Sequence, residues 1–386
     1  MKQKIYLDYS STTPLDAEVY EAMQPYFMEK FGNASSLHSY GRETKIVLEE
    51  SRATIAHAIN AEVGEIFFTS GGTESNNYAL IGTAFAEKRK TGKNHIIISA
   101  IEHHAVLHTA EYLRQLGYEI TILPVDSNGK VHLDTVEKSI TSKTMLVSVM
   151  HANNEVGTIQ PIEEIGKIAR EKKIFFHSDS VQTLGKISLD IQKISVDMLS
   201  FSAHKIYGPK GIGAIYIRKG VEIDSFLHGG AQERNRRAGT ENIPLIVGFA
   251  KAVEKIIAEK EHHYNHTIKI KNYLQSQLQS IEGVIINGHP TESLSNIFNI
   301  SFDSKVFSIE GDTLILNMDL QGIAVSSGSA CTSGSEKPSH VLQAMGRDAK
   351  TTTATIRFSF GKFTTMEEIE YIIQVVKNIT MIHKIK

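Results

Sequence analysis

The segment KIFFHSDSVQTLGKISLDIQKISVDMLSFSAHK (residues 173–205) contains two short apolar runs, KIFFHSD and VDMLSFS, that each end in polar side chains. Runs of this length, rich in β-branched and aromatic residues, are typical of buried strands. Open α/β sheets bind their ligands beyond the carboxyl ends of the strands. We therefore expect Asp179, Ser202, His204 and Lys205 to lie together at one edge of a sheet.

The alternation of short apolar runs with longer amphipathic stretches extends over residues 65–218. Further expected strands are EIFFT (65–69), HIIIS (95–99), EITILPV (119–125) and TMLVSVM (144–150). Expected helices are AVLHTAEYLRQLG (105–117) and PIEEIGKIAREKK (161–173), the latter with Pro161 in its first turn, where proline is tolerated. This alternation predicts right-handed crossovers and an α/β fold with a mainly parallel sheet.

The pattern changes near residue 243, where one long helical stretch runs to residue 283. Short strands are then expected at 284–287, 296–302 and 355–360, and helices at 312–322 and 365–379. Such runs predict a smaller α+β domain. We place the boundary at 255–265, which assigns residues 15–260 to a large domain and residues 1–14 with 261–386 to a small one.

Composition excludes several classes of protein. The 386 residues are 41% hydrophobic and 22% charged, with a formal net charge of −2, which excludes a disordered, collagen-like or coiled-coil chain. Without a basic excess, we expect no direct nucleic-acid partner and no membrane partner. No stretch reaches the roughly 18 apolar residues of a membrane helix, and the start MKQKIYLDYS lacks an apolar signal region. We expect a cytoplasmic protein without an intrachain disulfide, since Cys331 is the one cysteine.

The segment FTSGGTESNN (68–77) places two glycines between an expected strand and an expected helix. Backbone amides at the helix start, with the Thr73 hydroxyl, form an anion site, but a tight turn capped by Thr73 explains the same residues. The chain has neither GxxxxGK[ST] nor GxGxxG, so those two nucleotide sites are not expected. His104 and His108 are four residues apart, but without HExxH or a carboxylate cluster we expect no metal site.

Other residues each have a chemical and an ordinary interpretation. Lys205, leaving a strand end among apolar residues, is either a nucleophilic amine of lowered pKa or a solvated loop lysine. Asp179 either pairs with a cationic ring nitrogen or a metal, or caps a helix. His103, just after HIIIS, is placed for stacking or proton transfer. Cys331, in VSSGSACTSGSEKPS (325–339), is either an exposed thiol for attack or carriage, or an ordinary surface thiol.

A resemblance rests on many short segments in a fixed order. The chain carries YLDYSSTTP (6–14), GNASSLHSYGRE (32–43), TSGGTESNN (69–77), IEHHAV (101–106), MHANNEVGTIQPI (150–162), HSDSVQ (177–182), SFSAHKIYGPKGIGA (200–214), GGAQERNRRAGTEN (229–242), SSGSACTSGS (326–335) and IRFSFGKFTT (356–365). Together they resemble the cysteine desulfurases of the NifS/IscS-like branch, pyridoxal-phosphate (PLP) enzymes in the class V aminotransferase family. The resemblance implies PLP fold type I, with helices on both faces of the large sheet and a smaller α+β domain.

The resemblance also assigns roles by position. It implies that Lys205 holds PLP as a Schiff base, that Arg357 binds the substrate carboxylate, and that Cys331 accepts the sulfur. His103 would stack on the cofactor ring, and Asn154 would lie near the ring oxygen and the substrate. The remaining cofactor contacts would come from Thr73, Asp179, Gln182, Ser202, His204 and, from the second subunit of a homodimer, Thr240.

The implied activity converts L-cysteine to L-alanine and holds the sulfur as a persulfide on Cys331. The sulfur would pass to an acceptor protein, either an iron–sulfur scaffold or a tRNA thiolase. Because the chain ends at IHKIK, we expect no IscS-type extension for scaffold docking, and the acceptor stays open. The alternatives are a class V aminotransferase, which would not need Cys331, a selenocysteine lyase, and a catalytically idle homologue. Ser10, Ser11 and Ala34 depart from the family's frequent YLDYAATTP and GNPSS.

Overall fold

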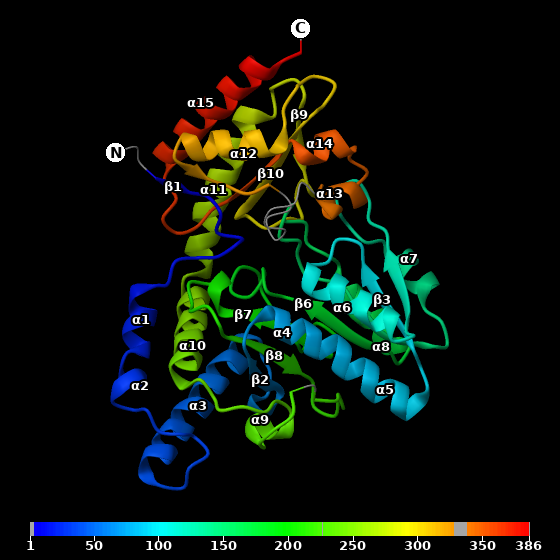
Figure 1. Ribbon diagram of the computed structural model, residues 1–386, viewed down its shortest axis with the longest axis vertical. Helices are drawn as coiled ribbons and strands as arrows, with labels where there is room; N and C mark the ends of the chain where they lie inside the picture. Colours follow the sequence, from blue (N-terminus) through cyan, green and yellow to red (C-terminus); the bar gives the residue numbers. More distant parts are fainter. Residues whose placement is uncertain (1–3, 226, 328–337, 386) are drawn as a thin grey trace.

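The computed structural model describes residues 4–225, 227–327 and 338–385. Its large sheet has the strand order β2–β8–β7–β6–β5–β3–β4 (Figure 1). The strands are β2 Ile66–Thr69, β3 His95–Ser99, β4 Glu119–Leu123, β5 Thr144–Ser148, β6 Phe175–Asp179, β7 Met198–Ser202 and β8 Gly213–Ile217. β8 is antiparallel to both of its neighbours, and the other neighbouring pairs are parallel. The expected mainly parallel sheet is confirmed.

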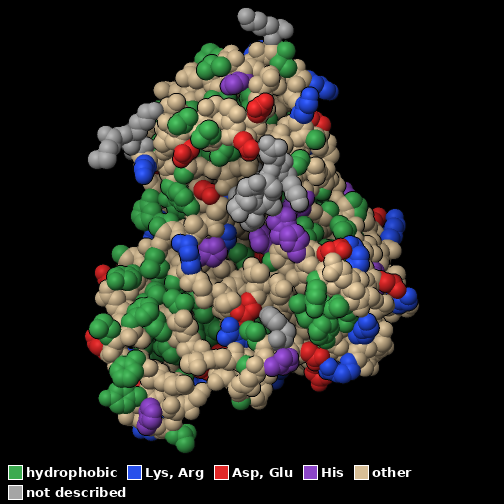
Figure 2. Space-filling view, in the orientation of Figure 1, with side chains coloured by type: hydrophobic (Ala, Val, Ile, Leu, Met, Phe, Trp, Pro, Cys, Tyr) green, Lys and Arg blue, Asp and Glu red, His purple; other side chains and the backbone are tan. Residues whose placement is uncertain are grey.

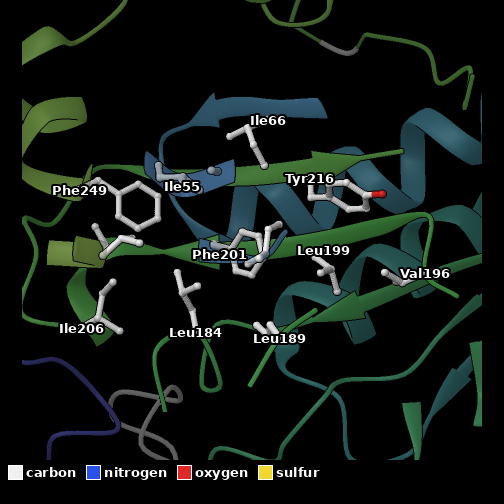
Figure 3. Close-up of a cluster of buried hydrophobic side chains, with 14 of the residues drawn as sticks. Ile55, Ile66, Leu184, Leu189, Val196, Leu199, Phe201, Ile206, Tyr216 and Phe249 are labelled. Atoms are coloured by element: carbon white, nitrogen blue, oxygen red, sulfur yellow. The ribbon is translucent and has the colours of Figure 1, made fainter. Parts of the chain in front are cut away.

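Helices cover both faces of this sheet. They are α1 Ala17–Met23, α2 Pro25–Met28, α3 Ser39–Ala58, α4 Gly72–Asn77, α5 Thr83–Thr91, α6 His104–Gln115, α7 Leu133–Ser139, α8 Ile162–Glu171, α9 Gln232–Asn235 and α10 Ile243–Ala258. Successive side chains of a strand point to opposite faces. Accordingly, Ile97 of β3 joins a buried cluster with Leu48 and Phe249, whereas Ile96 joins a second cluster with Val106. Figure 3 shows part of the first cluster, with Phe249 among its labelled side chains.

A smaller antiparallel sheet forms the other end of the molecule, at the top of Figure 1. Its order is β12–β10–β9, from β9 Val284–Asn287, β10 Ile297–Phe302 and β12 Thr355–Ser359, and beside it β1 Ile5–Tyr6 pairs in parallel with β11 Ile323–Ala324. The helices of this end are α11 Lys260–Leu278, α12 Gly311–Leu320, α13 His340–Ala344, α14 Ala349–Thr353 and α15 Met366–His383. They enclose a separate buried cluster that includes Ile270, Phe298 and Ile372. The expected α+β character of this part is confirmed.

The expected single helix over 243–283 is wrong, because α10 ends at Ala258 and α11 begins at Lys260. Ile256 of α10 belongs to the cluster of the large sheet, and Ile270 of α11 belongs to that of the small sheet. The two helices therefore pack against different cores, which one straight helix cannot do. The division of the chain near residue 260 stays a prediction, and the separate clusters support it.

Two local expectations also need correction. β8 was not expected, because it begins at Gly213 directly after the glycine- and proline-containing segment 208–212, which is typical of a loop. Pro161 precedes the first turn of α8 as its N-cap, so the helix begins one residue later, at Ile162. Among the described helices, none has the length and apolar character needed to cross a bilayer.

Candidate active site

A cavity of about 290 Å³ lies at the carboxyl ends of β6 and β7, facing β12. Its lining includes most of the predicted site residues: Thr73, His103, Asn154, Asp179, Gln182, Ser202, His204, Lys205 and Arg357. Figure 2 shows histidine side chains gathered on this face, between the two ends of the molecule. The edge of the large sheet thus brings together groups from Thr73 to Lys205, as expected for strand ends of an open α/β sheet, and Arg357 joins them from β12 of the small sheet.

Lys205 lies on a short 3₁₀ turn, Ala203–Lys205, directly after β7. Its Nζ donates hydrogen bonds to the backbone oxygens of Ser10 (2.5 Å) and Ser11 (2.7 Å). The expectation of apolar surroundings is therefore wrong at the amine itself, since carbonyl oxygens face it. Those oxygens come from the segment 8–13, which we call the N-terminal strap.

Asp179 is the last residue of β6 and is buried. Its Oδ2 accepts a hydrogen bond from Asn76 Nδ2 at 2.7 Å, and its Oδ1 accepts one from the backbone of Val181 at 3.0 Å. These donors fix the carboxylate without neutralising it, so the negative charge remains available to a cationic group in the cavity. Asn76 has no assigned role in the sequence analysis, although it follows Thr73 by three residues on α4.

His103 is the N-cap of α6, and its Nδ1 accepts a hydrogen bond from the backbone of Ala105 at 3.1 Å. Because Nδ1 accepts, the proton of the neutral ring lies on Nε2. Burial lowers the pKa of His103, while the charge of Asp179 acts in the opposite direction. The ring is therefore a neutral imidazole near neutral pH, suited to stacking and to proton exchange at Nε2.

The glycine-rich turn before α4 faces the strand-end residue Ser202. Gly71 has φ +152°, a conformation that favours glycine, and a Cβ on Gly72 would lie 2.7 Å from Val181 Cγ2. The backbone of the turn therefore packs closely against Val181 at the start of a continuous helical run from Gly72 to Thr91. Thr73 is exposed there and Ser202 is buried. Backbone amides and hydroxyls in this arrangement suit an anion.

His204 and Gln182 connect the cavity to the N-terminal strap. His204 Nδ1 lies 3.2 Å from Thr12 Oγ1, and burial, with the nearby charge of Lys205, lowers the pKa of His204 to about 4. Gln182 Nε2 donates to the backbone oxygen of Ser10 at 3.0 Å. Thr13 Oγ1 donates to the backbone oxygen of His204 at 2.9 Å. The strap is thus held against the sheet edge by side chains from both sides.

Arg357 of β12 closes the opposite wall and is only 2% exposed. Its Nη2 donates to Asp8 Oδ1 and to Ser11 Oγ, both at 2.7 Å. Its Nη1 donates to the backbone oxygen of Asn154 at 3.0 Å. A guanidinium held in this way at a cavity wall can bind a carboxylate.

Comparisons with known proteins agree with this geometry. A family model described as aminotransferase class-V matches residues 5–372. The chain belongs to the class V aminotransferase family. It is 50% identical over 380 residues to cysteine desulfurase IscS of Dictyoglomus turgidum, covering 98% of this chain and 95% of the relative. It is 49% identical to cysteine desulfurase IscS of Methanosarcina thermophila, covering 97% and 91%.

Solved structures similar to this chain include a NifS-like protein, with a TM-score of 0.89 and 40% sequence identity. The match covers 98% of this chain and 99% of that protein. Another is SspA in complex with cysteine, with a TM-score of 0.82, 36% identity and coverage of 94% and 100%. The predicted family branch and PLP fold type I are confirmed. Class V aminotransferases and cysteine desulfurases are PLP enzymes, so the family is a PLP family.

For two predicted residues, Thr240 and Cys331, no place in the lining of the cavity is established. Thr240 is exposed and does not line it. Cys331 lies outside the described residues. The histidines His104 and His108 have ring centroids 4.9 Å apart, and His104 lies equally close to His340. Within the described ranges, no group of histidine, cysteine and carboxylate side chains has the arrangement of a metal site.

Two buried carboxyl groups of this class V family member were missed by the sequence analysis. Glu102 accepts hydrogen bonds from Ser99 Oγ (2.5 Å) and the backbone of Met150 (2.8 Å), and burial raises its pKa to about 8. Glu155 lines the cavity and accepts a hydrogen bond from Ser339 Oγ at 2.5 Å. Burial raises the pKa of Glu155 to about 7. Each glutamate has an apolar neighbour on one side only, and glutamates are rarely buried, so the sequence carried no clear signal for either.

Proposed function

We propose that this protein is a PLP-dependent cysteine desulfurase that converts L-cysteine to L-alanine and carries the sulfur as a persulfide on Cys331. One observation carries the proposal: a single cavity joins a strand-end lysine, a buried aspartate and a buried arginine in a chain about half identical to cysteine desulfurases. An amine, a carboxylate and a guanidinium match the parts of an amino acid and of a pyridine cofactor that an enzyme of this kind must hold.

The residues of the cavity fit PLP. Lys205 Nζ would hold the cofactor covalently, and the Asp179 carboxylate would hold a proton on the ring nitrogen. His103 would stack on the ring, and Gln182 would donate to its phenolic oxygen. The phosphate would lie against the backbone amides at the start of α4, with donors from Thr73, Ser202 and His204. When bound, PLP supplies an electron sink for negative charge at the substrate Cα.

The substrate would be oriented from the opposite wall. Arg357 would bind the carboxylate of L-cysteine, and Asn154 lines the cavity beside it. Lys205 Nζ would accept the proton from Cα, and His103 Nε2 would exchange protons nearby. Arg357 and Lys205 are both in contact with the strap residue Ser11, which supports a substrate position between them.

Cys331 would act as the nucleophile. Its thiolate would form a bond to the substrate sulfur as the Cβ–S bond breaks, which leaves a persulfide on the protein and a three-carbon product released as alanine. The described residues that flank its segment support this role: Ser326 pairs with the backbone of Arg357, and Ser339 bonds Glu155. The segment that carries the thiol therefore leaves and re-enters the described chain at the cavity.

We also propose a homodimer in the cytoplasm. Phe27, Phe31 and Leu37 are 55%, 67% and 91% exposed. Figure 2 shows hydrophobic side chains gathered over α1 and α2 nearby. A patch of this kind is typical of an interaction surface. Exposed Thr240 would reach the phosphate of the neighbouring subunit. The persulfide would pass to an iron–sulfur scaffold or a tRNA thiolase.

The test measures sulfide and alanine released from L-cysteine in the presence of a reductant. Wild type should release both in equal amounts, whereas Cys331→Ser should release neither and should keep the visible absorbance of bound cofactor. A serine hydroxyl is similar in size but far less acidic, so folding should be unchanged. If Cys331→Ser released sulfide at the wild-type rate, the desulfurase assignment would be wrong, and pyruvate-dependent amino transfer would identify an aminotransferase instead.

A further inference from the structure

The Nη2 N–H groups that Arg357 would use to bind a carboxylate are already hydrogen-bonded to other residues of the chain. A guanidinium has five N–H groups, and it binds a carboxylate with two of them either through Nε and Nη2 or through Nη1 and Nη2. Both hydrogens of Nη2 are committed, one to Asp8 Oδ1 and one to Ser11 Oγ. Among the described residues, Nε is buried without a hydrogen-bond partner, and Nη1 bonds only the backbone oxygen of Asn154. Two-point binding of any further carboxylate therefore requires that Asp8 or Ser11 give up Nη2.

Charge decides which acceptor leaves. Two carboxylates on one Nη2 would repel each other in a buried site, whereas a neutral hydroxyl beside an incoming carboxylate carries no such cost. The Asp8 side chain is 19% exposed, so its carboxylate has access to water when it leaves, while Arg357 is almost fully buried. The Ser11 hydroxyl, by contrast, can stay and turn its own proton toward the new oxygen.

We propose that Asp8 is the resident counter-ion of Arg357, which the substrate carboxylate displaces on binding, and that Ser11 stays as the neutral partner. This rests on the proposed function, in which Arg357 binds the carboxylate of L-cysteine. Asp8 is thus a positioning residue that acts through Arg357. It keeps a buried positive charge paired in the empty cavity, and it makes each incoming anion compete for the guanidinium.

The exchange predicts an unusual direction of effect. Removal of the Asp8 charge should tighten the binding of L-cysteine, because the substrate no longer competes with a resident anion. We expect Asp8→Asn and Asp8→Ser to lower the Kd for L-cysteine about three- to tenfold. Ser11→Ala, which removes the other acceptor of Nη2 without removing a charge, is the matched control and should not lower the Kd for L-cysteine.

The experiment is calorimetric titration of the cofactor-loaded protein in a Cys331→Ser background, where L-cysteine binds without turnover. Cysteamine, which is cysteine without its carboxylate, serves as the second ligand, and its Kd should be the same with and without the Asp8 charge. Two neutral variants guard against a folding defect in one of them, and a thermal melt of each verifies folding.

The alternative outcomes separate the two proposals. If Arg357→Lys weakens L-cysteine binding but both Asp8 variants leave it unchanged or weaken it, the exchange is wrong and Asp8 is only a structural support. If Arg357→Lys leaves L-cysteine binding unchanged, Arg357 does not bind the substrate carboxylate, and the proposed displacement of Asp8 is wrong as well. Equal tightening for cysteamine would also overturn the exchange, because a ligand without a carboxylate cannot displace Asp8.

Discussion

The two walls of the cavity are assembled in different ways. In the sheet wall, Asp179 and Lys205 follow directly on β6 and β7, two neighbouring parallel strands. In the strap wall, Asp8 and Arg357 are 349 residues apart and meet through one ion pair. The first wall is rigid because its backbone belongs to the central sheet. The second exists only when the two ends of the chain are joined, so its geometry depends on a few specific contacts.

The largest expected effect comes from a substitution in the sheet wall. Lys205→Ala should abolish the absorbance of bound cofactor and lower turnover at least about 10³-fold, because it removes the amine that holds the cofactor and moves protons. Lys205 Nζ also donates to the strap oxygens of Ser10 and Ser11, and a bound cofactor stabilises the folded state, so the thermal midpoint should fall as well. Absorbance spectra, alanine release and a thermal melt measure these quantities.

Lys210→Ala is the control, since Lys210 is an exposed lysine five residues further along the same segment. It should keep both cofactor and turnover. Equal losses in the two variants would show that the segment tolerates no substitution, and normal turnover in Lys205→Ala would contradict the assignment of Lys205.

The next effect is a change of stability with pH, and it concerns the buried Glu102, which follows β3. Burial raises the pKa of Glu102 from 4.5 to about 8, so between these values the folded chain keeps a proton that the unfolded chain has released. The contribution of Glu102 to stability is therefore greatest below pH 4.5 and is lost as the pH rises through about 8. Glu102→Gln stays neutral, so its stability relative to wild type should increase by about 5 kcal/mol over this window.

Urea unfolding at pH 5 and pH 8.5 measures this difference. Glu171→Gln, at an exposed position in α8, should follow the wild type at both pH values. Parallel pH profiles for Glu102→Gln and wild type would mean that the Glu102 carboxyl is ionised throughout.

The smallest expected effect concerns the strap. Thr13→Val removes a hydroxyl that donates to the His204 backbone and accepts from the Tyr207 amide at 2.7 Å. We expect a loss of about 1–2 kcal/mol in unfolding free energy, with turnover within about twofold of wild type. Thr13→Ser keeps the hydroxyl and should recover most of the stability. A Ser variant as unstable as the Val variant would show that the methyl group, and not the hydroxyl, holds the strap.

The sheet wall was predictable from local pattern. Apolar runs that end in polar residues located Asp179, Ser202 and Lys205, because the strand period and the rule for strand ends act over a few residues. The bounds of β3 and β9 agree with the expected ones residue for residue. β8 was not predicted from the sequence, because the glycines and the proline just before it are typical of a loop.

The strap wall was not predictable in this way. Arg357 came only from a family resemblance, and Asp8 received no role, because no periodicity links residues 349 positions apart. Ser11 was noted only as a departure from the family, yet its hydroxyl bonds Arg357. Asn76, Glu102 and Glu155 are buried polar residues whose partners are fixed by tertiary packing. A single sequence shows which residues are present, but it does not show which distant residues come into contact in the fold.

The contact between Asp8 and Arg357 also determines the order in which the two walls of the cavity can form during synthesis. Asp8 is synthesised 349 residues before Arg357. The large sheet and its strand-end lysine belong to the earlier part of the chain and can fold as a unit during synthesis. Joining the two ends across 349 residues costs about 5 kcal/mol of loop-closure entropy, beyond a constant. In a nascent chain the residues of the sheet wall are therefore present before Arg357, and the substrate wall can form only after Arg357 has been synthesised.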